Sequence, residues 1–194
     1  MAKGSQMRKA AYAIDPIFID RWSPRAMSGT ALALEELMVL FEAARWAPSS
    51  SNLQPWRMLY ALRAAPDWPL FLGLLSDANR QWAQHGGALV AFLSNNIRDD
   101  GRPAPTHAFD TGAAWENFAL QASTRNLVVH GMQGFDHVRA RAELKLPPEF
   151  DIHAMVVVGK PGEVARLPES LRAREQPSDR RPLHESVCEG PFCF

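Results

Sequence analysis

Two arginines flank a serine in the stretch RWSPR, residues 21–25, with Trp22 beside the first of them. Guanidinium groups and a hydroxyl that converge on one point form charge-assisted hydrogen bonds, which suit a phosphate dianion. Arg21, Ser23 and Arg25 are therefore candidate phosphate ligands. Taken alone, the stretch is equally typical of surface arginines near the start of a helix.

A second polar stretch, RWAPSSSNLQPW, spans residues 45–56. Asn52 and Gln54 carry amides, which can pair with a ring that has both C=O and N–H edges. The small residues Ser49, Ser50 and Ser51 would let a flat ring lie against the backbone. The ordinary alternative is a polar loop that joins a helix to a strand.

A third basic feature is the adjacent pair Arg180 and Arg181, in a polar, Pro-rich segment near the end of the chain. Its simplest alternative is a solvated charge pair.

The sequence gives little support to other kinds of catalytic or metal site. The six histidines lack H-x-x-x-H or H-E-x-x-H spacing, so no metal site is expected. There is no G-x-S-x-G, no G-x-G-x-x-G and no P-loop.

The composition indicates a single domain with a substantial core, because 46% of the 194 residues are hydrophobic. Basic and acidic residues number 21 each, so the chain lacks the basic excess of a nucleic-acid-binding protein. No apolar run is long enough to span a membrane, and the start of the sequence lacks the apolar region of a signal peptide. We therefore expect a cytoplasmic protein in which Cys188 and Cys193 are free thiols.

Apolar periodicity predicts strands and helices that alternate without a regular βαβ rhythm, which favours an α+β fold. The predicted helix 31–46 would bury a face formed by Leu34, Leu37, Met38, Phe41 and Ala44. The other expected helices are 107–125, 136–144 and pieces within 66–84 that are broken at Pro69 and at the turn 77–79. The expected strands are 57–62, 87–95, 127–132 and 152–159. Residues 96–105 read as a surface loop.

The two ends of the chain differ from this body. Residues 163–194 have few core residues, so they either fray or dock on something other than their own core. Residues 1–15 are expected to be flexible. The domain prediction is accordingly one domain over residues 1–194 with an extended tail at its end.

The order of these pieces resembles the nitroreductase family of flavin mononucleotide (FMN) enzymes. The motif Pro-Ser-Ser-x-Asn-x-Gln-Pro-Trp carries most of the resemblance, and it follows Arg-x-Ser-x-Arg and an amphipathic helix. DTGAAWENFALQAS and HGMQGFD, within residues 110–136, resemble the family's central helix and the strand behind the flavin. VVVGKPG, residues 156–162, resembles its closing strand.

The resemblance implies a nitroreductase-like α+β fold, with a central, mainly antiparallel sheet flanked by helices. It also implies a homodimer with one flavin in each interface cleft, where each tail wraps the partner subunit. No nucleic-acid or membrane partner is expected. The implied activity is transfer of hydride from NAD(P)H to FMN and on to a small acceptor, such as a nitroaromatic or a quinone, by a ping-pong mechanism.

The resemblance assigns roles by position. Arg21, Trp22 and Ser23 lie at the phosphate clamp, and Arg25 corresponds to the cationic residue near the N1/O2 edge of the flavin. Asn52 would pair with the pyrimidine edge, and Pro48, Ser49 and Ser50 would line the ring or its partner-facing side. Met132, Gln133 and Gly134 would lie beside N5, where a backbone N–H can bond it. Arg180 or Arg181 would complete the phosphate site.

Two other functions remain open from the sequence. One keeps the fold but uses it for reductive dehalogenation or flavin breakdown, chemistry that requires a specialised lid. The candidate lid, residues 66–108, is short and has no evident set of residues to bind a zwitterion. The other alternative is a non-catalytic flavin-binding protein.

Overall fold

The computed structural model describes residues 3–194. Its centre is a four-stranded sheet with strand order β1-β2-β4-β3. The strands are β1 (Trp56–Leu62), β2 (Ala88–Asn95), β3 (Val128–Met132) and β4 (Phe150–Gly159). Each neighbouring pair is antiparallel, and β2 and β4 occupy the middle. The expected α+β fold with an antiparallel sheet is confirmed.

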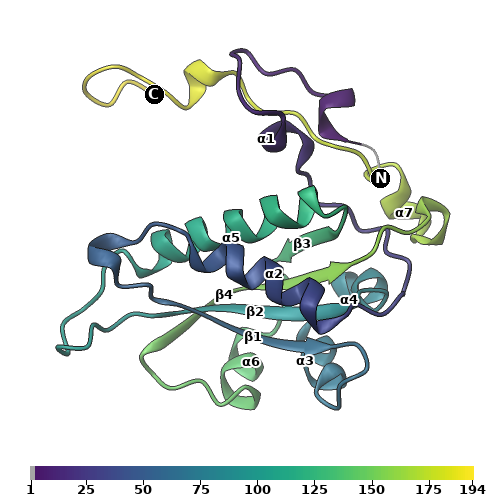
Figure 1. The fold of residues 1–194 in the computed structure, drawn as a ribbon, viewed down its shortest axis with the longest axis horizontal. Coiled ribbons are helices and arrows are strands. Elements are labelled where there is room, and N and C mark those ends of the chain that lie inside the picture. Colours follow the sequence, from purple (N-terminus) through teal and green to yellow (C-terminus); the bar gives the residue numbers. More distant parts are fainter. Residues whose placement is uncertain (1–2) are drawn as a thin grey trace.

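Helices cover both faces of this sheet (Figure 1). One face carries α2 (Leu34–Arg45) and α5 (His107–Thr124), and the other carries α3 (Trp68–Leu74), α4 (Asp77–Ala83) and α6 (His137–Glu143). Short helices α1 (Pro16–Asp20) and α7 (Glu169–Arg172) lie outside these layers. None of the helices in the described residues is long and apolar enough to cross a membrane.

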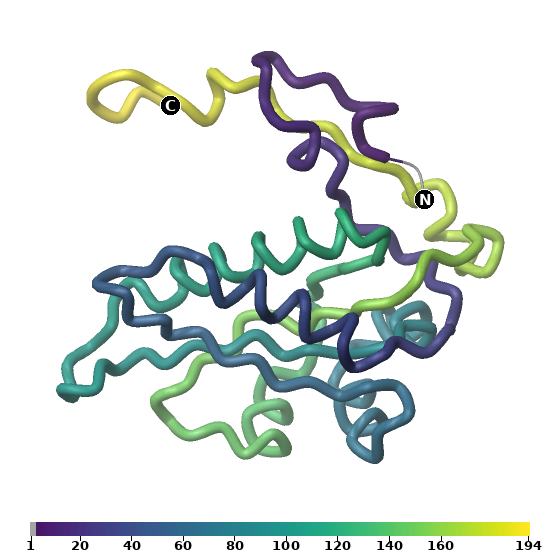
Figure 2. The backbone as a smooth tube through the Cα atoms, in the orientation of Figure 1, coloured from purple at the N-terminus to yellow at the C-terminus, as the bar shows by residue number. Residues whose placement is uncertain are grey.

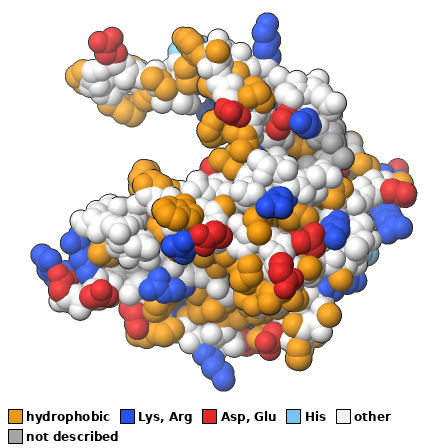
Figure 3. All heavy atoms as spheres, viewed as in Figure 1, with side chains coloured by type: hydrophobic (Ala, Val, Ile, Leu, Met, Phe, Trp, Pro, Cys, Tyr) orange, Lys and Arg blue, Asp and Glu red, His pale blue; other side chains and the backbone are white. Residues whose placement is uncertain are grey.

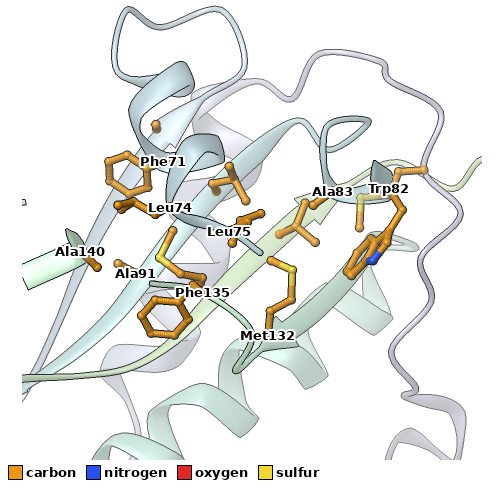
Figure 4. Packing of buried hydrophobic residues seen from close by; sticks show 14 of the residues in the cluster. Phe71, Leu74, Leu75, Trp82, Ala83, Ala91, Met132, Phe135 and Ala140 are labelled. Carbon is orange, nitrogen blue, oxygen red and sulfur yellow. The ribbon is translucent and has the colours of Figure 1, made fainter. Parts of the chain in front are cut away.

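Each face of the sheet has its own hydrophobic cluster. Beneath α5 and α2, Phe92 and Phe118 meet edge to face, with ring centroids 5.4 Å apart. On the opposite face, side chains from α3 and α4 converge with Met132 and Phe135 (Figure 4). Strand β2 is buried on both faces, as its nearly continuous apolar sequence requires.

Helix α2 buries a slightly different face from the expected one. Leu37, Leu40 and Ala44 are fully buried, whereas Leu34 and Met38 remain 40% and 37% exposed. Full burial of a leucine contributes about 1.5–3 kcal/mol, so Leu37 and Leu40 dominate the attachment of this helix. The periodicity identified the helix correctly and predicted the burial of Leu37 and Ala44, but it missed Leu40 and wrongly included Leu34 and Met38.

The breaks predicted within residues 66–84 are also displaced. Pro69 lies in the first turn of α3, where its missing N–H costs nothing, and the chain breaks instead at Leu75 and Ser76. The candidate lid is a second correction. Within residues 66–108, α3 and α4 pack into the core and β2 is a central strand, so this segment belongs to the body.

The two ends of the chain run side by side above α5 (Figure 2). Arg8 joins them, because its Nε donates to the carbonyl of Ser178 at 2.6 Å and its Nη1 donates to the carbonyl of Arg21 at 2.9 Å. Residues 1–2, part of the segment expected to be flexible, lie outside the described residues. Flexibility of the remainder of that segment stays a prediction.

The cysteines differ from expectation. The structure joins Cys188 and Cys193 in a disulfide, so the expected free thiols are wrong. A turn between them brings their Cα atoms to 6.5 Å, and Gly190 adopts a φ of +85° within it. A left-handed conformation of this kind favours glycine.

Candidate functional site

A cavity of about 410 Å³ lies between helix α5 and strands β3 and β4. We call it the interlayer cavity. Its walls combine apolar surface with a few polar groups, a composition typical of small-molecule sites. The lining residues are Arg21, Ser23, Phe92, Thr111, Gly112, Trp115, Glu116, Gly131, Met132, Gln133, His153 and Ala154.

A second hollow of about 420 Å³ adjoins the first, and Arg21 and Ser23 line both. We call it the basic hollow, because five arginines line it. Three come from the N-terminal part of the chain and two from the tail. The lining residues are Arg8, Arg21, Trp22, Ser23, Arg25, His130, Ala173, Arg174, Gln176, Pro177, Ser178 and Arg180.

The arginines of the basic hollow carry more positive charge than their neighbours compensate. Burial lowers the pKa of Arg8, and the charges of Arg180 and Arg21 lower it further. Burial also lowers the pKa of Arg25, although Glu175 opposes this effect with a carboxylate oxygen 3.9 Å from the guanidinium. Arginines that depress one another's pKa favour a bound anion, which would relieve their repulsion.

Arg21 has unused bonding capacity. Its Nε is buried and forms no hydrogen bond within the described residues, although a carboxylate oxygen of Glu116 lies 3.4 Å away. A buried donor without a hydrogen bond costs about 1–3 kcal/mol. A bound phosphate or ring oxygen could satisfy this donor from either side of the shared wall.

Two glycines give the interlayer cavity its shape. Gly112 lies inside α5, and a Cβ added there would meet nothing within 4 Å, because the position faces open space. Glycine inside a helix is unfavourable by roughly 0.5–1 kcal/mol relative to alanine, so an open position for it needs another reason. On the opposite wall, a Cβ at Gly131 would approach the ring of Trp115 to 3.3 Å. Gly112 thus keeps the cavity open, and Gly131 allows the ring of Trp115 to lie close against β3.

Met132, Gln133 and Gly134 follow one another at the end of β3. Met132 and Gln133 line the interlayer cavity. The carbonyl of Gly134 is held by the backbone N–H of Ser76 and by the side-chain amide of Asn79, each at 3.0 Å. Within residues 3–194, no hydrogen bond is formed by the backbone N–H groups of Gln133 and Gly134. Gln133 lines the interlayer cavity and Gly134 follows it directly, so both donors lie at or beside the cavity wall.

The loop of residues 48–54 lies elsewhere. Pro48, Ser49, Ser50 and Asn52 line neither the interlayer cavity nor the basic hollow of their own chain. The buried carboxylate of Asp110, near the start of α5, accepts from the backbone N–H of Ser50 at 3.2 Å. The structure therefore fixes this loop at the N-terminal end of α5.

The backbone of the same loop is strained. Ser51, Asn52 and Gln54 have φ values of +52°, +56° and +48°. Residues other than glycine seldom adopt this region, and such strain tends to cluster at functional sites. Ser49 helps to hold the conformation, because its hydroxyl accepts from the backbone N–H of Gln54 at 3.0 Å.

The predicted basic residues separate into two groups. Arg21, Arg25 and Arg180 line the basic hollow, whereas Arg181 does not. Arg25 does not line the interlayer cavity, although the resemblance placed it near the N1/O2 edge of the flavin ring. Sequence reasoning missed Arg8, and it also missed Trp115 and His153. Arg8 has no motif around it, and only its contact with the tail reveals its place.

No cluster of three or more metal-ligating side chains occurs in the part of the chain that the structure describes.

Comparison with known proteins places the chain in a family. The model of the Nitroreductase family matches residues 19–66. The solved structure of an FMN-containing oxidoreductase is 42% identical, with a TM-score of 0.92 over 96% of each chain. The chain belongs to the nitroreductase family. The resemblance seen in the sequence and the nitroreductase-like fold are thereby confirmed.

Two more distant comparisons agree with this membership. An NADH dehydrogenase of Thermus thermophilus is 29% identical, over 78% of this chain and 83% of its own length. The crystal structure of a nitroreductase family protein from Clostridium difficile 630 is 20% identical and superimposes with a TM-score of 0.67, covering 89% of this chain and 95% of the other. At that identity, the likeness shows the nitroreductase fold alone.

Proposed function

We propose that this nitroreductase-family chain is an FMN-dependent oxidoreductase that takes hydride from NAD(P)H and passes it to a small acceptor such as a quinone or a nitroaromatic. The observation that carries the proposal is the pair of adjoining hollows that share Arg21 and Ser23. One is basic and suits a phosphate, and the other lies between layers and suits a flat ring. The FMN-containing oxidoreductase that is 42% identical supports this choice of cofactor.

The residues present fit FMN. Arg21, Ser23 and Arg180 would hold its phosphate, with Arg8 and Arg25 adding positive charge. Met132 would line the ring, and the free backbone N–H groups of Gln133 and Gly134 are the donors available to a ring nitrogen. When bound, FMN supplies the hydride chemistry, so the protein needs no nucleophile of its own.

The contribution of this chain is therefore to bind, orient and shield. Arginine charge neutralises the phosphate dianion, and the apolar walls exclude water from the reacting face. One cavity would admit NAD(P)H and the acceptor in turn, which gives ping-pong kinetics. The name of the T. thermophilus relative, NADH dehydrogenase, supports a nicotinamide donor.

We further propose a homodimer in which residues 163–194 dock on the partner subunit of a single-domain chain. Hydrophobic side chains gather over α2 and β1, where Met38 and Tyr60 are more than a third exposed (Figure 3). In the tail, Leu183, Val187 and Phe192 are more than half exposed. Soluble monomers seldom expose apolar surface on this scale. In the dimer, the loop of residues 48–54 would complete the partner's cavity, which gives Pro48, Ser49, Ser50 and Asn52 their predicted role.

The experiment begins with the colour of the purified protein. We expect a yellow protein whose heat-released cofactor runs as FMN in chromatography, which NAD(P)H bleaches and a quinone reoxidises. A colourless protein that takes up no added flavin would refute the proposal. A flavin-loaded protein that NAD(P)H does not bleach would instead indicate a binding protein without catalysis. Light scattering tests the dimer, and a stable flavin-loaded monomer would contradict it.

A further inference from the structure

Ser94 lies between two histidines at one end of the interlayer cavity. Its side chain is fully buried, and its Oγ lies 2.7 Å from His107 Nδ1 and 2.6 Å from His153 Nε2. His107 Nε2 in turn lies 3.8 Å from a carboxylate oxygen of Asp151. His153 lines the cavity, whereas the side chain of Asp151 is 42% exposed to solvent. The side chain of His107 is itself 19% exposed, so the hydrogen-bonded chain His107–Ser94–His153 joins solvent to the cavity, with the Asp151 carboxylate near its outer end.

A β-bulge aims His153 at this cavity. In the pairing of β2 with β4, Phe92 is opposite Ala154 and Leu93 is opposite Ile152, so His153 is the extra residue. Regular alternation would place His153 and Ala154 on opposite faces of β4. Because of the bulge, both line the interlayer cavity. Bulges that redirect a side chain are frequent beside active sites.

The hydrogen-bond roles within the chain follow from its charges. The Asp151 carboxylate favours a proton on His107 Nε2, so in the neutral protein His107 Nδ1 accepts from the Ser94 hydroxyl. A hydroxyl has one proton to donate, so Ser94 Oγ must accept from His153 Nε2–H. His153 Nδ1 is then a bare acceptor, and it forms no hydrogen bond within the described residues. One added proton reverses this order and leaves a proton on His153 Nδ1.

On the basis of the function proposed above, we propose that His153 is a catalytic acid that protonates the electron acceptor, and that Ser94 and His107 resupply its proton. Reduction of a quinone to a hydroquinone takes up one hydride and one proton. The hydride originates from NAD(P)H, and His153 Nδ1 supplies the proton to an acceptor oxygen. The Ser94 hydroxyl proton then moves to His153 Nε2, and the His107 Nδ1 proton moves to Ser94. No electrons move within the chain, and its charge falls by one.

The groups around His153 act on its pKa in opposite directions. Burial lowers the pKa of His153, and the charge of His107 lowers it further, while Asp151 opposes both effects. Asp151 is itself held by Asn96 Nδ2 at 3.1 Å and lies 3.5 Å from Arg141 Nη2. Across the cavity, Arg21 and Glu116 are the charged side chains in the wall. A lowered pKa makes the protonated imidazole of His153 a stronger acid, which favours transfer of its proton to an acceptor.

The first test compares two acceptors in stopped-flow reoxidation of protein previously reduced with NAD(P)H. Benzoquinone needs a proton, whereas ferricyanide takes only electrons. A positioned acid contributes about 10²–10⁴-fold, so His153→Gln should slow the quinone reaction at least tenfold and leave the ferricyanide reaction within about twofold. Ser94→Ala should act in the same direction and flatten the pH profile, and Ser94→Thr should restore it. His85→Gln, outside both hollows, is the matched control.

The second test does not depend on turnover. In ¹⁵N spectra of the imidazoles, recorded without flavin, His107→Gln should raise the pKa of His153, and His85→Gln should leave it unchanged. An unchanged pKa of His153 in His107→Gln overturns the inference. An unaffected quinone rate in His153→Gln, or an equal loss with both acceptors, overturns it as well. If NAD(P)H fails to bleach the wild-type protein, the proposed function fails first, and the two failures are thereby distinguished.

Discussion

Arg21 Nε lies 3.4 Å from a carboxylate oxygen of Glu116, and Arg21 is one of two residues that line both hollows. The arginine side chain is 17% exposed and the glutamate side chain 44%. Glu116 thus offers partial compensation to a donor that forms no hydrogen bond within the described residues. A phosphate would compete with Glu116 for the same guanidinium. Substitutions of Arg21 and of Glu116 should therefore have opposite effects on FMN affinity.

Arg21→Ala should weaken FMN binding by roughly tenfold or more, because a charge-assisted contact contributes about 1.5–3 kcal/mol. Glu116→Gln should strengthen FMN binding by up to about fivefold, since a partly exposed ion pair is worth about 0–1 kcal/mol. Fluorescence quenching of added FMN measures both. Glu35→Gln, on the exposed side of α2, is the control, and normal binding by Arg21→Ala would contradict the site.

The adjacent arginines of the tail should differ. Arg180 lines the basic hollow. Arg181 does not, and it lines only a surface hollow between residues 8–19 and residues 179–183. We expect Arg180→Ala to lower FMN affinity by about tenfold and Arg181→Ala to change it by less than about twofold. The same titration checks both, with each variant as the control for the other. Equal losses of FMN affinity in the two variants would contradict the separate roles of Arg180 and Arg181.

Gly112→Ala should separate helix stability from ligand binding. The added methyl meets nothing within 4 Å, so the flavin-free protein should gain up to about 1 kcal/mol in the free energy of unfolding. The same methyl occupies the interlayer cavity, so FMN affinity should fall. Urea unfolding and FMN titration measure the two effects. Gly73→Ala in α3, where a Cβ would make only an ordinary contact with Arg139, should stabilise the protein without a change in FMN affinity.

His130 should make stability depend on pH. Burial and then the charge of Arg25 lower its pKa to about 4 from 6.5. Between these values the unfolded chain binds more protons than the folded one, so stability is full above pH 6.5 and is lost as pH falls toward 4. At about pH 5 the loss is about 2 kcal/mol.

Urea unfolding of flavin-free protein at about pH 7.5 and pH 5 tests this. His130→Phe should retain an aromatic ring against Trp82, whose centroid lies 4.8 Å from that of His130, and its stability should depend less on pH in this window. His85→Gln should keep the dependence of the wild type. Identical pH dependence in the wild type and in His130→Phe would assign the effect to another group.

The sequence predicted the elements whose periodicity is local and strong. Helix 107–125 and strand 87–95 were each placed to within about one residue of α5 and β2, because their apolar pattern repeats over many residues. The buried face of α2 was only partly predicted, because periodicity shows that a helix has an apolar side but not how far the neighbouring elements cover it, and Leu34 and Met38 stay exposed. The breaks around Pro69 failed because proline is tolerated in a first helical turn.

The residues of the candidate site could be predicted only where they lie within a short sequence motif. The RWSPR stretch and the end of β3 lead directly to the hollows. Arg8 could not be found in this way, because its partner Ser178 is 170 residues away. His153 could not be found either, since its direction depends on a bulge, and the register of β4 against β2 sets that bulge.

The basic hollow takes one wall from Arg8 and residues 21–25, and the other from residues 173–180. A ribosome releases the first of these segments well before the second. The sheet is finished when Gly159 has emerged, but the hollow still lacks a wall at that moment. A nascent chain that has emerged only as far as Gly159 therefore has a finished sheet but cannot yet enclose an anion from both sides.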